Sequence, residues 1–350
     1  MNFEIKVLVV GDYLSPIHED AVCKAFINNK ITVQSFRLSS YFKNDNYIRK
    51  KINNFQQKYV IGPSIFKINR DLISEVKKSE YNFVFFYRPR IFKSETLKTI
   101  AKSTIIYFYN NDDPFGHLYN KYYWKNFFDG LKYCNHIFYY RLKNKSDYEK
   151  IGYKNTSLLR SYYVNYLNFP TNKKYLYDVV FVGHYENDGR DEYIKFLIDN
   201  KVNIKIFGPE WNRSKYYKFF YKYLGNITNL NIYNYNEALN QAKIALVFLS
   251  TLNSDSYTRR CFEIPATKTF MLSKYSDDLA NLFVPEKEAD YFYNKHDLLS
   301  KINFYLNNSE KREEIVKNAF LKLLHGNHEV TDRIKIILDQ YNADIISKNN

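Results

Sequence analysis

The chain has 350 residues, of which 45 % are hydrophobic, so it can bury a sizeable core and is long enough for two domains. Its formal net charge of +15 favours an anionic partner, although the whole chain is so rich in Lys, Asn, Ile, Tyr and Phe that compositional bias explains the charge equally well. Three widely spaced cysteines, Cys23, Cys134 and Cys261, argue against a disulfide framework or a zinc site and fit a reducing compartment.

The first residues, "MNFEIKVLVVG", contain an apolar run too short for a signal peptide. No later run approaches the roughly 20 apolar residues that a membrane-spanning helix needs. We therefore expect a cytoplasmic protein, and we leave open a peripheral contact with the inner face of the membrane.

The first half of the chain alternates short apolar runs with helix-like segments. "KVLVVG" (6–11) is followed by "HEDAVCKAFINN" (18–29), whose apolar residues have helical spacing. Further strand-like runs follow at 32–38, 81–89, 103–110 and 135–141. This pattern predicts a parallel sheet with crossover helices in an N-terminal domain over residues 1–165, and the aperiodic segment around Pro170 predicts a linker.

The pattern then restarts at "YDVVFVG" (177–183) and continues to about residue 274 through "RDEYIKFLIDN", "NIKIFGP", "LNIYNY", "NEALNQA", "KIALVFLS", "RRCFEIPA" and "TFMLS". We predict a second Rossmann-like domain over residues 175–327. From residue 296 the tail has a helical period, apart from "HGNHE" at 325–329. Its last segment, 328–350, is expected to be a helix packed on the N-terminal domain, because Val330, Ile334, Ile337 and Leu338 share one face.

Ligands of open α/β sheets bind at the carboxyl ends of the strands, so the loops that leave the strands are the candidate sites. The loop "GHYENDGR" (183–190) begins with Gly183 and His184 and places Arg190 at the start of a helix. The unpaired N–H groups of a helix start, with an arginine beside them, form an anion site. The alternative is that this segment is an ordinary solvent-exposed turn with no ligand.

A second loop leads into "YTRRCFEIPATKTF" (257–270), where Thr258 is one of several residues able to cap a helix. Arg259 and Arg260 then stand in its first turn, where cations oppose the helix dipole unless an anion such as a diphosphate offsets them. Glu263 lies on the same face and suits the two hydroxyls of a ribose. The alternative is an Arg–Glu pair on a solvated helix.

The stretch "YTRRCFEIPATKTFMLSKYSDDLANLFVPEKEADYF", together with "DVVFVGHYENDGRDEYIKFL", "IKIFGPEW" and "NDDPF", resembles the CgeB-like glycosyltransferases of the spore-maturation family. The likeness covers most of residues 80–330 and is densest from 178. It implies a GT-B fold, in which two Rossmann-like domains face each other across a cleft. It also implies that the C-terminal half binds a nucleotide-diphosphate sugar, with Glu263 at the ribose and Arg190 and Arg260 at the diphosphate.

This sequence departs from the family pattern at two turns. The family often has small residues and glycines where this chain has Thr267, Lys268 and Thr269, and usually a glycine where it has Glu286. These changes put the tightness of the adjoining turns in question and leave the charged helix intact.

The acceptor and the catalytic base are expected on the N-terminal half. In "YFYNNDDPFGH" (107–117), Asp112 and Asp113 precede a proline, where a carboxylate serves either as a general base or as part of an Asx turn. His18 is a further candidate base or sugar contact, although a lone histidine is more often structural. Arg88 and Arg90 are candidate acceptor-binding residues, and a plain basic loop explains them equally well.

The sequence therefore predicts a GT-B glycosyltransferase of polysaccharide biosynthesis, acting on a glycan, glycolipid or other cell-surface acceptor. The C-terminal half has no Asp-x-Asp motif at a strand end, so we expect no required metal and no cofactor. A nucleotide-sugar epimerase and a non-catalytic basic protein that binds nucleic acid or an anionic surface remain the alternatives, with nucleic acid the less favoured partner.

Overall fold

The computed structural model describes residues 5–119, 121–172 and 174–349; residues 1–4 and Asn350, at the two ends of the expected domains, lie outside the described part. It divides the chain into two units, one formed by residues up to Arg160 and from Val330 onward, the other by Ser161–Glu329. The first division falls after Arg160 rather than between 165 and 175, so the segment around Pro170, which was expected to be a linker, belongs to the second unit. The second division, after Glu329, lies two residues beyond the expected boundary at 327.

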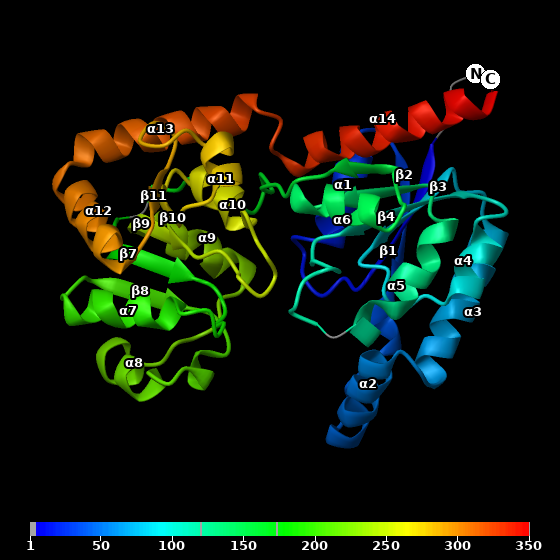
Figure 1. Cartoon of the computed structure of the whole chain (residues 1–350), viewed down its shortest axis with the longest axis horizontal. Coiled ribbons are helices and arrows are strands. Elements are labelled where there is room, and N and C mark those ends of the chain that lie inside the picture. The colour runs from blue at the N-terminus through cyan, green and yellow to red at the C-terminus, as the bar shows by residue number, and fades with distance from the viewer. Residues whose placement is uncertain (1–4, 120, 173, 350) are drawn as a thin grey trace. The chain divides into compact units, whose positions relative to one another are not determined.

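The first unit is a six-stranded parallel sheet with helices on both faces (Figure 1). Its strand order is β2-β1-β3-β4-β5-β6, so the order reverses between β1 and β3. Its strands are β1 (Lys6–Gly11), β2 (Thr32–Arg37), β3 (Phe83–Tyr87), β4 (Ile105–Asn110), β5 (His136–Tyr139) and β6 (Thr156–Leu158). Its helices are α1 (Glu19–Asn28), η1 (Leu38–Tyr41), α2 (Tyr47–Tyr59), α3 (Pro63–Lys78), α4 (Ser94–Ile100), η2 (Lys121–Trp124), α5 (Lys125–Gly130), η3 (Leu131–Tyr133), α6 (Lys143–Lys150) and α14 (Val330–Asn349).

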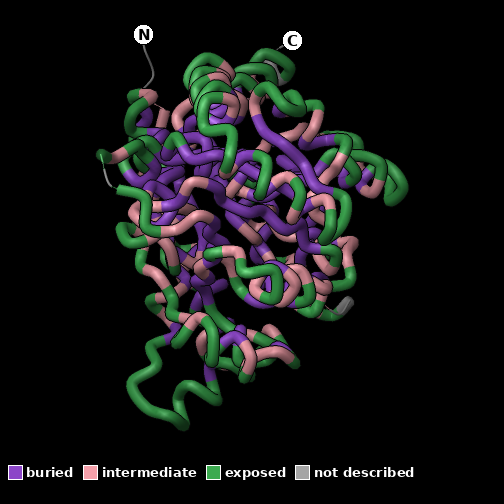
Figure 2. The backbone as a smooth tube through the Cα atoms, turned by 90° about the vertical axis from the view of Figure 1, so that its left-hand side faces the viewer, coloured by how far each residue is buried: buried purple, intermediate pink, exposed green. Residues whose placement is uncertain are grey.

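Alternating strand residues feed two cores in this unit. Leu8, Val84 and Phe86 pack with buried side chains of α3, α4, α5 and α6 on one face of the sheet. On the other face, Phe83 contacts Phe26 of α1 and Tyr341 of α14, with ring centroids 5.9 and 5.2 Å apart. The central strands β1, β3, β4 and β5 are buried, whereas the edge strands β2 and β6 are largely exposed or half-buried. The burial of each residue along the backbone is shown in Figure 2.

Helix α14 belongs to the first unit although the second unit separates it from the rest in sequence. Val330, Ile334 and Ile337 are buried, as their spacing predicts, and Leu338 is half-buried. The Tyr107 hydroxyl of β4 also donates to the Asp344 carboxylate at 2.6 Å. The C-terminal helix thus completes one face of the N-terminal sheet.

The second unit has a five-stranded parallel sheet in the order β11-β10-β9-β7-β8, which reverses between β7 and β9. Its strands are β7 (Tyr177–Val182), β8 (Ile204–Phe207), β9 (Ala242–Val247), β10 (Phe270–Lys274) and β11 (Asp290–Phe292). Its helices are α7 (Arg190–Asp199), η4 (Trp211–Arg213), α8 (Tyr217–Leu224), α9 (Ile232–Asn240), α10 (Arg260–Ala266), α11 (Asp277–Leu282), α12 (Lys295–Asn307) and α13 (Ser309–His325).

Two parallel α/β units confirm the predicted fold class, with one local difference. "LNIYNY" contributes no strand, because the Asn231 side chain accepts hydrogen bonds from the backbone N–H groups of Tyr233 and Asn234 and starts α9 there. The two turns that depart from the family pattern keep left-handed backbone, with φ of 55° at Lys268 and 58° at Glu286. Within the described part of the chain, no helix is long and apolar enough to cross a membrane.

Candidate functional site

The carboxyl ends of β7 and β9, where the strand order of the second sheet reverses, form the first candidate site. The loops after β7 and β8 touch backbone to backbone: a Cβ on Gly208, whose φ is 134°, would lie 2.2 Å from the carbonyl oxygen of Gly183. The Trp211 indole N–H donates to that same oxygen at 3.0 Å. Glycine at 208 and the Trp211 bond therefore fix the start of the loop that follows β7.

Arg260 begins α10 and lies beside this loop. A Cβ built on Gly183 would be 3.4 Å from Nη1 of Arg260, and the guanidinium carbon is 5.9 Å from the centre of the Phe181 ring. The Nε atom of Arg260 is buried without a hydrogen-bond partner, and within the described residues the side chain forms no ion pair. Because buried polar groups are nearly always paired, this guanidinium is available to an anion.

Glu263 lies one turn further along α10 and is buried. It accepts a hydrogen bond from the Tyr235 hydroxyl at 2.6 Å, and among the described residues it forms no ion pair with Arg260. Burial raises the pKa of Glu263, while the nearby positive charges of Arg259 and Arg260 oppose that rise. The solvated Arg–Glu pair that the sequence also allowed is therefore not what the helix forms.

Thr258 precedes α10 and is buried. Its backbone N–H points at the Sγ atom of Cys261, 3.5 Å away, and its Oγ1 lies 3.9 Å from the same sulfur. These contacts fix the entry to the helix rather than leaving the Thr258 side chain open to a ligand.

Arg190 departs from expectation. Its Nε and Nη2 atoms donate to both oxygens of Asp188, at 2.8 and 2.6 Å, and Nη1 donates to the carbonyl oxygen of His184 at 2.8 Å. Asp188 also accepts from the backbone N–H of Arg190, so the chain's own carboxylate occupies the start of α7. The expected contact of Arg190 with a diphosphate is thus not supported, because its charge is neutralised and its side chain buried.

Glu186 is a residue of this edge that the sequence reasoning missed. It accepts from Ser250 Oγ after β9 at 2.5 Å, lies 2.7 Å from His184 Nε2, and is 3.3 Å from Arg190 Nη2. Burial alone would raise the pKa of Glu186, but the His184, Arg190 and Ser250 contacts outweigh it and lower the pKa to about 2. The signal was present in the alternation Glu186, Asp188, Arg190, which places both acids within reach of one arginine.

The first sheet has its own reversal point between β1 and β3, and charged groups gather at its carboxyl edge. Arg88, with φ of 55°, follows β3 and lies 3.7 Å from both Asp12 and Asp112. Burial alone would lower the pKa of the Arg88 guanidinium. The negative charges of Asp112 and Asp12 outweigh that effect, so the pKa lies above its usual value. The Nε–H of Arg88 is buried and donates to no hydrogen-bond partner among the described residues.

A third carboxylate, Glu19, lies behind this group and was also missed. It is buried, and its Oε1 accepts from the backbone N–H of Asp12 at 3.0 Å. Burial raises the pKa of Glu19, and Arg88 partly offsets that rise. The carboxylates of Asp12, Glu19 and Asp112 thus surround the guanidinium of Arg88. Their negative charge argues against a site for a strongly anionic acceptor.

Asp113 is placed as a structural residue. Its side chain is fully buried, Oδ1 accepts from the backbone N–H of Phe115 at 3.0 Å and from Asn144 at 2.9 Å, and Lys143 Nζ is 2.7 Å from Oδ2. The first of these bonds is the Asx turn that the sequence allowed as its alternative. The expected role of Asp113 as a general base is therefore not supported, whereas the Asp112 side chain remains partly exposed.

The other expected residues of this unit are tied to neighbours. His18 Nδ1 lies 3.0 Å from the Tyr87 hydroxyl. Arg90 donates to the carbonyl oxygen of Gln57 on α2 at 2.8 Å and stacks over the Tyr123 ring, 4.5 Å from its centre. The geometry brings His18 and Arg88 to one edge of the sheet and directs Arg90 toward α2.

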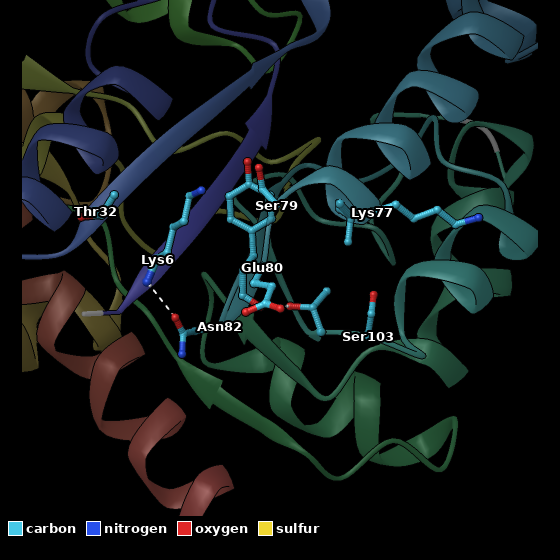
Figure 3. A pocket seen from close by; sticks show the side chains of 10 residues that line it. Lys6, Thr32, Lys77, Ser79, Glu80, Asn82 and Ser103 are labelled. Atoms are coloured by element: carbon cyan, nitrogen blue, oxygen red, sulfur yellow. Dashed lines mark hydrogen bonds between the residues drawn. The ribbon is translucent and has the colours of Figure 1, made fainter. Parts of the chain in front are cut away.

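The surface also has hollows, among them one in each unit. One of about 900 Å³ lies at the amino ends of β1–β4, the opposite edge of the first sheet, and is lined by residues such as Lys6, Asn82 and Thr104 (Figure 3). Two of its polar contacts are internal to the chain, since the Lys6 backbone N–H donates to the Asn82 side chain and the Thr104 hydroxyl donates to the carbonyl oxygen of Tyr81. A smaller hollow of about 390 Å³ in the second unit flanks the β7–α7 loop.

No group of three or more His, Cys, Asp and Glu side chains suited to a metal ion occurs among the described residues. Metal independence therefore stays a prediction from the sequence.

Comparison with known proteins agrees with the fold described above. Residues 190–339 match the family described as glycosyl transferase-like. A sucrose-phosphate synthase from Thermosynechococcus elongatus superposes with a TM-score of 0.69 at 9 % identity, over 97 % of this chain and 100 % of that one. The fold is GT-B.

Two other structures share this fold. HepE from Anabaena, solved with UDP and glucose, has a TM-score of 0.62 at 9 % identity, over 97 % of this chain and 100 % of that one. A candidate UDP-N-acetylglucosamine 2-epimerase from Listeria monocytogenes has 0.61 at 10 % identity, over 99 % of this chain and 98 % of that one. The sequence matches no protein with a curated description.

Proposed function

We propose that this protein is a glycosyltransferase that moves a sugar from a nucleotide-diphosphate donor to a hydroxyl of a glycan, glycolipid or other cell-surface acceptor. The observation that carries the proposal is the Arg260 guanidinium, which has no partner among the described residues and stands at the reversal point of the second sheet. It lies within the segment that matches the glycosyl transferase-like family. Membership of the CgeB-like family is part of the proposal.

In the donor site, Arg260 binds the diphosphate and Glu263 accepts the ribose hydroxyls, with Tyr235 fixing one carboxylate oxygen. Gly183 and His184 approach the donor through their backbone, while Arg190, Asp188 and Glu186 shape the loop. HepE, which was solved with UDP and glucose, supports a uridine nucleotide as the first donor to test. As the sugar–phosphate bond breaks, charge develops on the diphosphate, and Arg260 stabilises it more strongly than in the ground state.

In the acceptor site, Asp112 takes the proton of the attacking hydroxyl. Arg88 lies equally far from Asp12 and Asp112, so it orients these carboxylates rather than recruiting an anionic acceptor. A neutral hydroxyl group of a sugar is the acceptor chemistry that this edge favours. Arg90 takes no part in this step, because its guanidinium is held by Gln57 and Tyr123.

The first experiment is a thermal-shift screen of UDP, GDP and their sugar conjugates, with duplex DNA as the comparison. A ligand at a hundredfold its dissociation constant adds about 2.7 kcal/mol to the free energy of unfolding. We expect a nucleotide diphosphate to raise the melting temperature, and mass spectrometry to find the sugar on an acceptor from a cell extract. Epimerised donor without transfer would favour an epimerase, and stabilisation by DNA alone would favour a binding protein.

We also propose that transfer needs no divalent metal, since Arg260 supplies the positive charge at the leaving diphosphate. Treatment with EDTA should then leave the rate of transfer unchanged within about twofold, a small factor beside the orders of magnitude that metal catalysis supplies. Loss of activity that Mg²⁺ or Mn²⁺ restores would contradict this part of the proposal.

A further inference from the structure

Helix α2 turns its apolar side away from the protein. The buried side chains of this helix are the polar Asn53 and Gln56. In contrast, Ile48, Ile52, Phe55 and Tyr59, which are spaced at i, i+4, i+7 and i+11, are each more than half exposed. At 3.6 residues per turn this spacing forms one continuous stripe along the helix. The helix is therefore amphipathic, but its polar side faces the protein and its apolar side faces solvent. A helix that packs on a core has the opposite orientation.

Exposed apolar residues also follow the helix along the chain. Ile61 in the turn after α2 and Phe66 in the first turns of α3 are 60 % and 64 % exposed, and the Phe55 and Tyr59 rings touch with centroids 4.7 Å apart. Single exposed apolar residues are ordinary on protein surfaces. A contiguous row of them marks a contact with another molecule or a membrane.

Positive charge accompanies the stripe. Between residues 43 and 67 the chain has six Lys or Arg residues and one acid, Asp45. Lys51 lies over the Tyr47 ring and Lys58 over the Tyr59 ring, with Nζ 4.6 and 5.2 Å from the ring centres. Beside the stripe a hollow of about 710 Å³ is lined by Lys43, Arg49, Lys67 and Ile52, among others.

We propose that this surface binds an anionic phospholipid bilayer. We define the α2 surface as the apolar residues Tyr47, Ile48, Ile52, Phe55, Tyr59, Ile61 and Phe66 with the basic residues Lys43, Arg49, Lys50, Lys51, Lys58 and Lys67. The stripe enters the boundary between headgroups and acyl chains, and the basic side chains meet the headgroup phosphates. Lysine stems and aromatic rings suit this boundary, because each has an apolar body and a polar tip.

Charge decides between a membrane and a second copy of the chain. Two α2 surfaces placed face to face would bring together two sets of six basic residues with one acid each, and the like charges would repel. A bilayer with anionic lipids offers the complementary charge over a wide area, at about 1 kcal/mol for each basic residue near the surface.

The α2 surface lies at the carboxyl edge of the first sheet, since α2 follows β2 and η1, and Arg90 in the loop after β3 donates to the Gln57 carbonyl on α2. Membrane binding would therefore bring lipid to the edge that carries Asp12, Arg88 and Asp112. The proposal itself does not depend on the proposed enzymatic function, and its test measures no catalysis.

The test is flotation of the full chain with vesicles of phosphatidylglycerol and phosphatidylcholine in equal amounts, beside vesicles of phosphatidylcholine alone. We expect binding to the first and at least tenfold weaker binding to the second. Phe55→Ser should weaken binding to the mixed vesicles about tenfold, because a buried phenylalanine contributes about 1.5–3 kcal/mol. Phe304→Ser, at an equally exposed phenylalanine of α12, is the matched control and should bind as the wild type does.

A second pair of variants isolates the charge. Lys51→Gln and Lys58→Gln should each weaken binding about fivefold, whereas Lys311→Gln on α13 should not. Four of the five positions are exposed and Lys311 is half-buried, so unchanged melting temperatures will confirm that the variants fold. No flotation of the wild type, equal binding to both kinds of vesicle, or equal binding of Phe55→Ser and Phe304→Ser would overturn the proposal. So would self-association that Phe55→Ser abolishes while vesicle binding stays intact.

Discussion

Arg190 and Arg260 stand at the starts of α7 and α10, but of these two only Arg190 has its charge neutralised by a residue that the structure describes. Asp188, two residues earlier, accepts two hydrogen bonds from the Arg190 guanidinium and one from its backbone N–H. Arg260 has no such neighbour among the described residues. The difference separates an arginine that builds a loop from one that is available to a ligand.

The two neighbouring aspartates of the first unit are expected to differ when changed. Asp112→Asn should slow transfer by about 10² to 10⁴ while donor affinity stays the same, because it removes the proposed proton acceptor. Asp113→Asn should instead lower the melting temperature. The change weakens the buried hydrogen bonds from Phe115 and Asn144 and removes the ion pair with Lys143. The measurements are a product assay, a donor titration and thermal unfolding of each variant.

Stable folding of Asp113→Asn with a collapsed rate, beside an active Asp112→Asn, would reverse this assignment. If both variants stay active, the proton acceptor lies elsewhere, and His18 is then the next residue to change.

The stability of the second unit should depend on Glu186 in a pH-dependent way. Its folded-state pKa of about 2 is below its usual 4.5, so its contribution is fully present above about pH 4.5 and is lost as the pH falls toward 2. A shift of this size corresponds to about 3 kcal/mol. Glu186→Gln should therefore lose most stability near neutral pH, with a smaller loss near about pH 3.

Urea unfolding of Glu186→Gln and wild type at both pH values checks this, with Glu210→Gln at an exposed position of the same unit as control. A loss of stability that does not change with pH would show that the Glu186 contacts act through shape rather than charge.

At the scale of elements, α14 is a structural part of the first sheet rather than a tail. It covers Phe83 through Tyr341, and its Ile337 is fully buried. Ile337→Ala should lower the free energy of unfolding of this unit by about 2–5 kcal/mol, the usual range for a buried isoleucine. Ile346→Ala, on the same helix but exposed, should change it by less than about 0.5 kcal/mol.

Denaturant titration of both α14 variants is the measurement. Equal stability of Ile337→Ala and Ile346→Ala would mean that the helix contributes little to the unit.

The alternation of strands and helices was predictable because buried parallel strands are continuous apolar runs, such as Val7–Val10 and Val179–Val182. Helix α2 was not, because its apolar stripe faces solvent and its polar Asn53 and Gln56 face the protein, the reverse of the pattern used to read a sequence. The helical start at Asn231 was missed for a local reason: a side-chain cap outweighed the strand-like letters that follow.

The candidate site was predictable to the level of loops and residue types. Arg260 and Glu263 come to the expected edge of the sheet, as the spacing on α10 indicates. Which charges stay unpaired depends on contacts across loops, such as Ser250 with Glu186 or Arg88 with Asp12, and no single-sequence pattern reports those.

At the scale of the whole molecule, the net charge of +15 says little about the two candidate sites. Acids surround Arg88 in one unit and Arg190 in the other, so both edges are close to neutral or acidic. The basic excess is instead concentrated on segments such as the α2 surface. A local excess of basic residues therefore identifies the proposed membrane contact. The proposed donor site is identified instead by one arginine, Arg260, that has no partner among the described residues.

The most direct test of the central claim is calorimetric titration of UDP and GDP into wild type, Arg260→Ala and Arg213→Ala. Arg213 is an exposed arginine of the same unit, paired with Glu210. We predict that wild type and Arg213→Ala bind at least one of the two nucleotides equally well. Arg260→Ala should bind it about ten- to a hundredfold more weakly, as expected for the loss of about 1.5–3 kcal/mol from a charged hydrogen bond. Absence of binding by the wild type, or equal binding by all three proteins, would contradict the account.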